Sequence, residues 1–265
     1  MNYSKLLEGK YAVITCGDSA IGVAIVRLFA EHGAAVVVGA KDVRAASKLI
    51  STIGSIPPDS FCRACDLADA NSIEAFCSEV NRRLPLVNIL VNNPWMEFDK
   101  AFEDADEDDD ELILQVYQRS IMQTLRAFWP AMLKAGSCSV VNISSSSVFK
   151  AVQGTLLHTM ANGAVGGMTR VPAVEGGVRE VRVNEILTAY DSNCRMQANT
   201  AEDASSTEDA SGTEVACTAG ATNTAEDTYA VEVANAALFL AGDMASYVSG
   251  ISLSVSGGLR RARFT

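Results

Sequence analysis

Short apolar runs rich in β-branched residues alternate with helical patterns along most of this 265-residue chain. Unbroken runs of this kind are typical of strands that are covered by helices on both faces. The predicted strands lie at residues 12–14, 35–38, 60–66, 86–91, 139–143, 181–186 and 251–255, and the clearest helical patterns lie at 21–31, 112–133 and 231–240. Strands that alternate with helices pair in parallel through right-handed crossovers. We therefore expect an α/β fold with a doubly wound parallel sheet of about seven strands, in a single domain over residues 1–265.

Two stretches depart from this alternation. Residues 103–111 are almost entirely Asp and Glu and precede the helical pattern at 112. Carboxylates are favoured at a helix N-terminus, so we interpret this run as a solvated helix start rather than a cation site. Residues 197–227 are rich in Ala, Thr, Ser, Glu and Asp and contain almost no large apolar residue. Such a segment cannot offset its ordering entropy by burial, and we expect a low-complexity flap there.

Charge and cysteine content narrow the classes of partner. The net charge of −11 disfavours nucleic acid, because phosphate binding needs a basic surface. No apolar run reaches the roughly 18 residues that a membrane span needs, and the N-terminus lacks a signal-like pattern, so we expect a cytoplasmic protein without a membrane partner. The seven scattered cysteines indicate free thiols. Cys62 and Cys65 form a CxxC in a predicted strand, where residues three apart face opposite sides, so we expect no shared metal ion.

Five short motifs occur in order along the chain. They are Thr15-Cys16-Gly17-Asp18-Ser19-Ala20-Ile21-Gly22, Asp66-Leu67, Asn92-Asn93-Pro94-Trp95, Val181-Arg182-Val183-Asn184 and the stretch from Glu232 to Gly258. In this order and spacing they resemble the motifs of the short-chain dehydrogenases/reductases over nearly the whole chain. The resemblance implies a Rossmann-like fold and hydride transfer with NAD or NADP. It also implies that Thr15, Gly17, Asp66 and Asn92 stand at dinucleotide-binding positions.

The glycine-rich turn departs from the family pattern. Gly22 remains for the packing of helix against strand, but Cys16 and Ala20 replace the glycines that permit the tight turn and the close approach of the pyrophosphate. Pro94 and Trp95 replace two small residues beside the cofactor, and a tryptophan is bulky enough to occupy the adenosine space.

Other cofactor contacts are altered as well. The family's Pro-Gly after the sixth strand becomes Thr188-Ala189, and the threonine that holds the carboxamide aligns with Asn193. The second strand is followed by Lys41 and lacks the acidic residue that binds the ribose of NAD, a difference that favours NADP. We expect this chain to bind no dinucleotide.

The catalytic set of the family is largely replaced. Counting along the motifs places the family's serine on Ser145, its tyrosine on His158, its lysine on Asn162 and its relay asparagine on Tyr117. Only the serine is kept. Asn162 cannot supply the positive charge that lowers the pKa of the tyrosine in the family's mechanism, so the resemblance implies that this mechanism is absent.

These departures lead to a first hypothesis, a catalytically degenerate subunit. It would pair with an intact paralogue in a hetero-oligomer, a tetramer by analogy with the family, and the partner would carry NAD and the chemistry. The interface helices of the family, near residues 112–133 and 155–176, and the C-terminal segment are kept. The pattern of loss resembles the non-catalytic subunit of the heteromeric 2-(α-hydroxybenzyl)succinyl-CoA dehydrogenase of anaerobic toluene degradation, which implies an acyl-CoA substrate.

Two alternatives stay open. A cofactor-independent isomerase, dehydratase or lyase would use His158 as the base, Ser145 as the oxyanion donor and Tyr117 as a second acid. An NADPH-dependent carbonyl reductase would use His158 as the proton donor and Lys41 to favour NADP, but it must tolerate the altered glycine turn.

Overall fold

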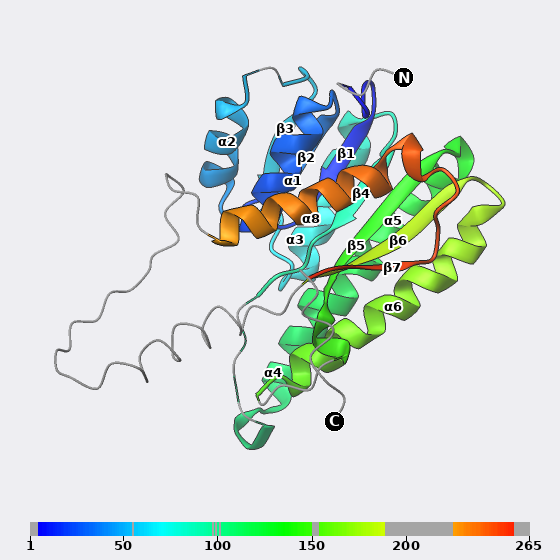
Figure 1. Cartoon of the computed structure of the whole chain (residues 1–265). Coiled ribbons are helices and arrows are strands. Elements are labelled where there is room, and N and C mark those ends of the chain that lie inside the picture. Colours follow the sequence, from blue (N-terminus) through cyan, green and yellow to red (C-terminus); the bar gives the residue numbers. More distant parts are fainter. Residues whose placement is uncertain are drawn as a thin grey trace.

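The computed structural model describes residues 5–54, 56–96, 98, 100, 102–149, 154–188 and 225–256. These residues contain one parallel sheet in the order β3-β2-β1-β4-β5-β6-β7 (Figure 1). The strands are β1 (Tyr11–Ile14), β2 (Ala35–Ala40), β3 (Phe61–Ala64), β4 (Ile89–Asn92), β5 (Cys138–Ser145), β6 (Val181–Thr188) and β7 (Ser252–Val255). The predicted doubly wound α/β fold is confirmed. The fourth strand begins at Ile89, three residues later than predicted, although the Asn88 backbone already donates to the Tyr11 carbonyl at 3.0 Å and accepts from the Ser139 amide at 2.9 Å.

Helices cover both faces of the sheet, and each face has its own core. On one face lie α1 (Ala20–Glu31), α2 (Val43–Thr52) and α8 (Ala225–Ala241), and on the other lie α3 (Ala70–Arg83), α5 (Ser120–Ala135) and α6 (Leu156–Gly177) (Figure 1). Successive strand residues point to opposite faces, so Val141 packs with the first group of helices and Val140 with the second. This burial on both faces is the reason that the central strands are continuous apolar runs.

The acidic run forms a helix start, as predicted, but the helix begins at Glu107 rather than near 112. Helix α4 (Glu107–Leu114) is capped by Asp106, whose side chain accepts from the Asp109 amide at 3.0 Å while the Asp109 carboxylate accepts from the Asp106 amide at 3.1 Å. This reciprocal cap satisfies amides at the helix N-terminus. The chain then passes through a π-helical turn (Gln115–Arg119) into α5. The described residues contain no group of three or more His, Cys, Asp or Glu side chains that could hold a metal ion.

A chain of buried amide and hydroxyl groups ties the two central strands to two helices. Thr124 of α5 donates to Asn92 Oδ1 at 2.7 Å, Asn92 donates to Asn142 Oδ1 at 2.9 Å, and Asn142 donates to Thr169 of α6 at 3.0 Å. All four side chains are almost fully buried. Buried polar groups of this kind are costly unless they are paired, so the chain fixes how α5 and α6 sit against the carboxyl ends of β4 and β5.

The two remaining predictions on local structure can be compared in part. Cys62 packs in the core beside α1 and Cys65 in the core beside α3, so the CxxC faces opposite sides as predicted. The predicted flap at 197–227 extends too far, because α8 already begins at Ala225. The rest of that flap lies outside the described residues. Across the part of the chain that the structure describes, every helix is too short or too polar to span a bilayer.

Two glycines give a direct test of this packing. A Cβ on Gly22 would collide with the Cys16 carbonyl, whereas a Cβ on Gly163 of α6 would meet nothing within 4 Å. We expect Gly22→Ala to lower the free energy of unfolding by about 3 kcal/mol through overpacking. Gly163→Ala should raise the stability of the isolated chain by about 0.5–1 kcal/mol through helix propensity. Urea denaturation of both variants measures the difference, and equal effects would contradict the close contact at Gly22.

Candidate functional site

Most of the predicted site residues meet at the carboxyl ends of the central strands. The strand order reverses between β1 and β4, and in open α/β sheets ligands bind beyond the carboxyl ends at such a point. Thr15 and Cys16 follow β1, while Asn92 and Ser145 end β4 and β5. The fold therefore brings to one edge of the sheet residues that lie far apart in sequence.

The turn after β1 is well ordered although it lacks the family's first glycine. Cys16 has a positive φ of 43°, a left-handed conformation that costs a side-chain-bearing residue about 1 kcal/mol or more. Its carbonyl accepts hydrogen bonds from the Ser19 amide at 3.1 Å, the Ser19 hydroxyl at 2.9 Å and the Asn93 side chain at 3.2 Å. These three bonds hold the strained turn. Ser19 in turn caps α1 by accepting from the Gly22 amide at 3.1 Å.

Glycine is still required at two places in this turn. A Cβ on Gly17 would collide with Val38, and a Cβ on Gly22 would collide with the Cys16 carbonyl. Ala20, in the position of a family glycine, is exposed at the first residue of α1. The turn thus has glycine at the two positions that packing requires, and it has Cys16 and Ala20 where the resemblance implies the tight-turn glycine and the glycine beside the pyrophosphate.

The polar side chains that the resemblance places beside the adenosine of a dinucleotide are paired within the chain. Lys41 Nζ lies 3.0 Å from Asp66 Oδ2, and Asp66 Oδ1 accepts from the Ala68 amide at 3.0 Å. Burial opposes the ionisation of Asp66, but the Ala68 amide and Lys41 outweigh it and lower the pKa of the carboxyl. Asp18 accepts from the Asp42 amide at 2.9 Å. A carboxylate that already holds a lysine and an amide is a weaker acceptor for an added ligand.

The side chains of Cys16 and Trp95 differ in burial. Burial raises the pKa of the Cys16 thiol to about 12, so the side chain is an uncharged thiol at neutral pH. Trp95, expected to occupy the adenosine space, is 56% exposed. Met96 is half-buried against the core beside α3 and α5.

Asn162 joins three of the tetrad positions by hydrogen bonds. Its oxygen accepts from the Ser145 amide at 3.0 Å, and its nitrogen donates to the His158 carbonyl at 2.8 Å and lies 3.2 Å from His158 Nε2. Because the amide nitrogen is a donor, His158 Nε2 accepts and the ring proton lies on Nδ1. Burial lowers the pKa of His158 to about 4, so the ring is neutral near pH 7.

Tyr117 completes the cluster from the π-helical turn. Its ring lies edge-on to His158 with centroids 5.3 Å apart, and its hydroxyl lies 3.3 and 3.4 Å from the Met96 amide nitrogen and carbonyl oxygen. A π-helical turn inside an α-helix often marks a functional site. The structure thus places Tyr117, Ser145, His158 and Asn162 together, as the alignment of motifs predicts.

Asn92 and Thr188 both make hydrogen bonds within the chain. Asn92 is 1% exposed, and its amide is engaged in the buried polar chain with Thr124 and Asn142, so here it is a packing residue rather than a ligand contact. Thr188 donates to the Ser144 carbonyl at 2.9 Å and ends β6. Asn193, the expected carboxamide position, lies outside the described residues.

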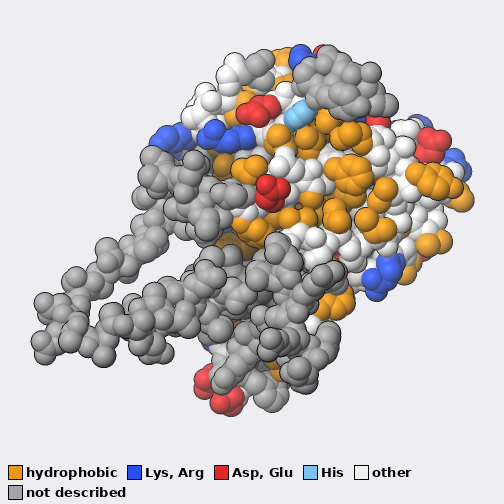
Figure 2. Space-filling model, in the orientation of Figure 1, with side chains coloured by type: hydrophobic (Ala, Val, Ile, Leu, Met, Phe, Trp, Pro, Cys, Tyr) orange, Lys and Arg blue, Asp and Glu red, His pale blue; other side chains and the backbone are white. Residues whose placement is uncertain are grey.

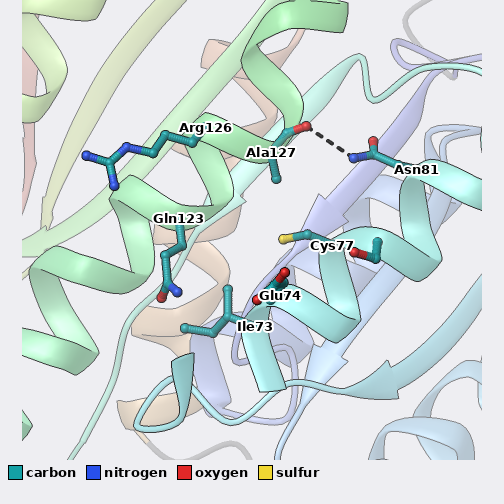
Figure 3. Close-up of a pocket in the computed structure, with 8 residues that line it drawn as sticks. Ile73, Glu74, Cys77, Asn81, Gln123, Arg126 and Ala127 are labelled. Carbon is teal, nitrogen blue, oxygen red and sulfur yellow. Dashed lines mark hydrogen bonds between the residues drawn. The ribbon is translucent and has the colours of Figure 1, made fainter. Parts of the chain in front are cut away.

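A hollow lies away from this cluster, between α3 and α5 (Figure 3). It has a volume of about 380 Å³ and is lined by Ile73, Glu74, Cys77, Ser78, Asn81, Gln123, Arg126 and Ala127. The Asn81 side chain bridges it by donating to the Ala127 carbonyl at 3.1 Å. Burial raises the pKa of the Cys77 thiol to about 12. This groove contains none of the predicted site residues.

Comparisons with known proteins agree with this geometry. A family model described as enoyl-(acyl carrier protein) reductase matches residues 16–260. The chain belongs to the short-chain dehydrogenase/reductase superfamily. It is 29% identical to the 2,5-dichloro-2,5-cyclohexadiene-1,4-diol dehydrogenase of Sphingobium indicum over 95% of this chain and 96% of that protein. It is 28% identical to the 3-oxoacyl-[acyl-carrier-protein] reductase of Thermotoga maritima over 96% of this chain and 98% of that protein.

Solved structures show the same likeness. A crystal structure described as that of a β-ketoacyl-ACP reductase matches with a TM-score of 0.75 and 27% identity over 96% of this chain and 99% of that one. A short-chain dehydrogenase/reductase family protein matches with a TM-score of 0.77 and 28% identity over the same shares of the two chains. The fold and the oxidoreductase superfamily are thus established for this chain.

Two residues of the site were missed by the sequence analysis. Asn93 donates to both the Cys16 carbonyl and the Ser19 hydroxyl, at 3.2 and 3.0 Å, and so fixes the turn. Ser147 donates its amide to Ser145 Oγ at 3.1 Å. The signals were the second asparagine of the Asn-Asn pair and the run of four serines at 144–147.

The low pKa of His158 predicts a pH dependence of stability. The folded-state pKa of about 4 lies below the ordinary value of 6.5, so protonation favours the unfolded chain as the pH falls. His158 should therefore reduce the free energy of unfolding by about 2–3 kcal/mol between pH 7.5 and 4.5. His158→Phe should lack this contribution, and His32→Asn should retain it. Denaturant titrations at both pH values test this, and parallel pH profiles for wild type and His158→Phe would refute it.

Proposed function

We propose that this chain is a catalytically degenerate subunit that assembles with an intact short-chain dehydrogenase/reductase paralogue. The observation that carries the proposal is the environment of Asn162. Asn162 stands where the resemblance places a lysine and is 1% exposed. Its side-chain amide makes hydrogen bonds with Ser145 and His158. A neutral amide whose hydrogen bonds are already made offers neither the positive charge nor the free donor that the family's proton transfer uses.

The residues at the dinucleotide-binding positions support the same proposal. Asp66 is paired with Lys41, and Asn92 is engaged in the buried polar chain. Ala20 adds a methyl group where the pyrophosphate approaches the backbone in the family, and Cys16 adds a side chain at the position of the tight-turn glycine. These residues fit NAD or NADP poorly, so we assign the dinucleotide to the partner subunit. No step of the chemistry is assigned to this chain.

The two enzyme alternatives receive less support from the site. With a pKa of about 4, His158 is almost entirely neutral at pH 7, so an imidazolium that donates a proton to a carbonyl is scarce. The same low pKa makes the neutral ring a weak base for an isomerase, dehydratase or lyase step. Its Nε2 is also occupied by the Asn162 amide.

The surface supports assembly. Helix α6 exposes a stripe of apolar residues and glycines at steps of three or four, the spacing that lines one face of a helix. The stripe consists of Leu156, Met160, Gly163, Gly167, Val171, Val174 and the C-cap residue Val178. Val174 and Val178 are 79% and 84% exposed. Figure 2 shows apolar side chains gathered over the face that carries α6, α8 and β7, with few charges among them. A monomer gains nothing from such exposure, whereas an interface does.

The family resemblance suggests which partner and which substrate class to propose. An intact paralogue would supply NAD and the proton-transfer residues, and a hetero-tetramer would bury the apolar face. Because one relative is a 3-oxoacyl-[acyl-carrier-protein] reductase, a thioester is a reasonable substrate class for the assembly. Within that class we propose an acyl-CoA, with 2-(α-hydroxybenzyl)succinyl-CoA as the specific candidate to assay.

One test of this proposal measures dinucleotide binding by the isolated chain. Calorimetric titration with NAD, NADH, NADP and NADPH should give no measurable binding, because the cofactor contacts are substituted or paired internally. An intact paralogue, titrated under the same conditions, serves as the positive control. Micromolar binding by this chain would overturn the proposal and would direct attention to His158 as a proton donor.

Another test of this proposal measures assembly with a paralogue. Co-expression with each intact family member of the same genome should yield one pair that co-elutes in size-exclusion chromatography and has dehydrogenase activity. Val174→Glu should abolish co-elution, because it places a charge in the apolar stripe. The matched variant Ala75→Glu, on the exposed side of α3, should leave co-elution unchanged. Loss of co-elution in both variants, or in neither, would contradict an interface on α6.

A further inference from the structure

The exposed sides of α5 and α6 form one face, which we call the α5–α6 face. The two helices lie in the same layer over the sheet (Figure 1). The ring of Tyr117, which precedes α5, lies edge-on to that of His158 near the start of α6. Further along, the ring of Trp129 packs on Gly176, where a Cβ would lie 2.8 Å from it. A stable interface is wider than one helix, so a partner on the apolar stripe of α6 also meets α5.

Cations outnumber anions on the α5–α6 face. The two helices contain four Asp, Glu, Lys or Arg side chains, and all four are exposed: Arg126, Lys134, Arg170 and Glu175. None of the three cations forms an ion pair with another residue that the structure describes. The whole chain has a net charge of −11. This face is therefore a locally positive surface on an acidic protein.

Other arginines of the same protein are neutralised within the chain. Glu79 of α3 lies 2.6 to 3.6 Å from three guanidinium groups, those of Arg63, Arg82 and Arg83. An unpaired cation costs little while water surrounds it. At an apolar interface the same cation must meet a carboxylate or lose its hydration without compensation. The charges of the α5–α6 face thus restrict which partner can cover it.

Two of the cations lie beside the apolar stripe. Arg170 follows the stripe residue Gly167 by three positions, and its guanidinium lies over Gly166, where a Cβ would be 2.9 Å from Nη1. Figure 3 shows the Arg126 side chain extended away from α3. Both arginines fall between the two ring contacts that join α5 to α6. They therefore stand near the middle of the face, where a partner desolvates them.

A second copy of this chain fits the face poorly. A closed two-fold interface places the same surface of both copies together. Arg126 and Arg170 of both copies would then share one partly desolvated interface, with Glu175 as the one carboxylate that each pair of helices supplies. Like charges repel more strongly there than in water. A partner with carboxylates at the facing positions would convert this repulsion into attraction.

We propose that the α5–α6 face selects a partner whose facing helices carry carboxylates opposite Arg126 and Arg170, and that these arginines disfavour the pairing of two copies of this chain. The inference rests on the proposed function for the place of the interface, and it adds the charge of the partner. Apolar contacts are non-directional, so the stripe supplies affinity without discrimination. Charges at its border supply the discrimination.

The test compares the full-length chain with the double variant Arg126→Gln/Arg170→Gln. Glutamine removes the charge and keeps a polar side chain. The matched control is Arg44→Gln/Lys48→Gln, because it removes two exposed cations from α2, which covers the other face of the sheet. Sedimentation equilibrium measures self-association of each isolated chain. Calorimetric titration with the paralogue that co-elutes with wild type measures the mixed pair.

The two equilibria are expected to shift in opposite directions. In the double variant, the Kd for self-association should fall about tenfold because repulsion is removed, and the Kd for the paralogue should rise about tenfold because ion pairs are lost. The control should change neither Kd. For wild type, raising the NaCl concentration from about 0.15 M to about 1 M should shift both equilibria in the same senses, because the Debye length falls from about 8 to about 3 Å.

Four results would contradict the inference. A stable homodimer of the wild-type chain at low salt would show that the arginines do not prevent self-pairing. A shift of both Kd values in one direction would indicate a structural effect of the substitutions. An unchanged Kd for a co-eluting paralogue would remove the inference and leave the proposed function standing. If no paralogue co-elutes with wild type, the proposed function fails, and the partner inferred for this face fails with it.

Discussion

The buried polar chain from Thr124 through Asn92 and Asn142 to Thr169 is the constraint on which the site depends. It links α5, β4, β5 and α6, the elements that carry or adjoin the tetrad positions. Each amide in it has its partner within an almost solvent-free core, so a change in the position of one element would leave a polar group unpaired. This cost holds the framework in place whatever residues occupy the cleft above it.

On that framework the substituted positions have found partners within the chain. Lys41 pairs with Asp66, and Asn162 bonds to Ser145 and His158. The Cys16 carbonyl accepts three hydrogen bonds that hold its turn in a conformation suited to glycine. These contacts explain how the family fold accommodates the residues that stand at these positions, because their polar groups have partners within the chain.

The sequence predicts most of the fold because its strands are apolar on both faces and its helices on one. It is less accurate at boundaries, where single side chains decide. The side-chain cap of Asp106, for example, lets α4 begin five residues before the apolar pattern. The position of Trp95 also could not be read from its bulk, since exposure depends on the direction of the backbone after β4.

The sequence by itself determined the superfamily fold and the order of its elements, because periodicity and motif spacing are local properties of the chain. Only the tertiary structure decided which polar groups are paired. It showed Asn92 inside the core and His158 neutral beside Asn162. Hydrogen bonding and desolvation depend on residues brought together from distant segments, and no local pattern encodes that proximity.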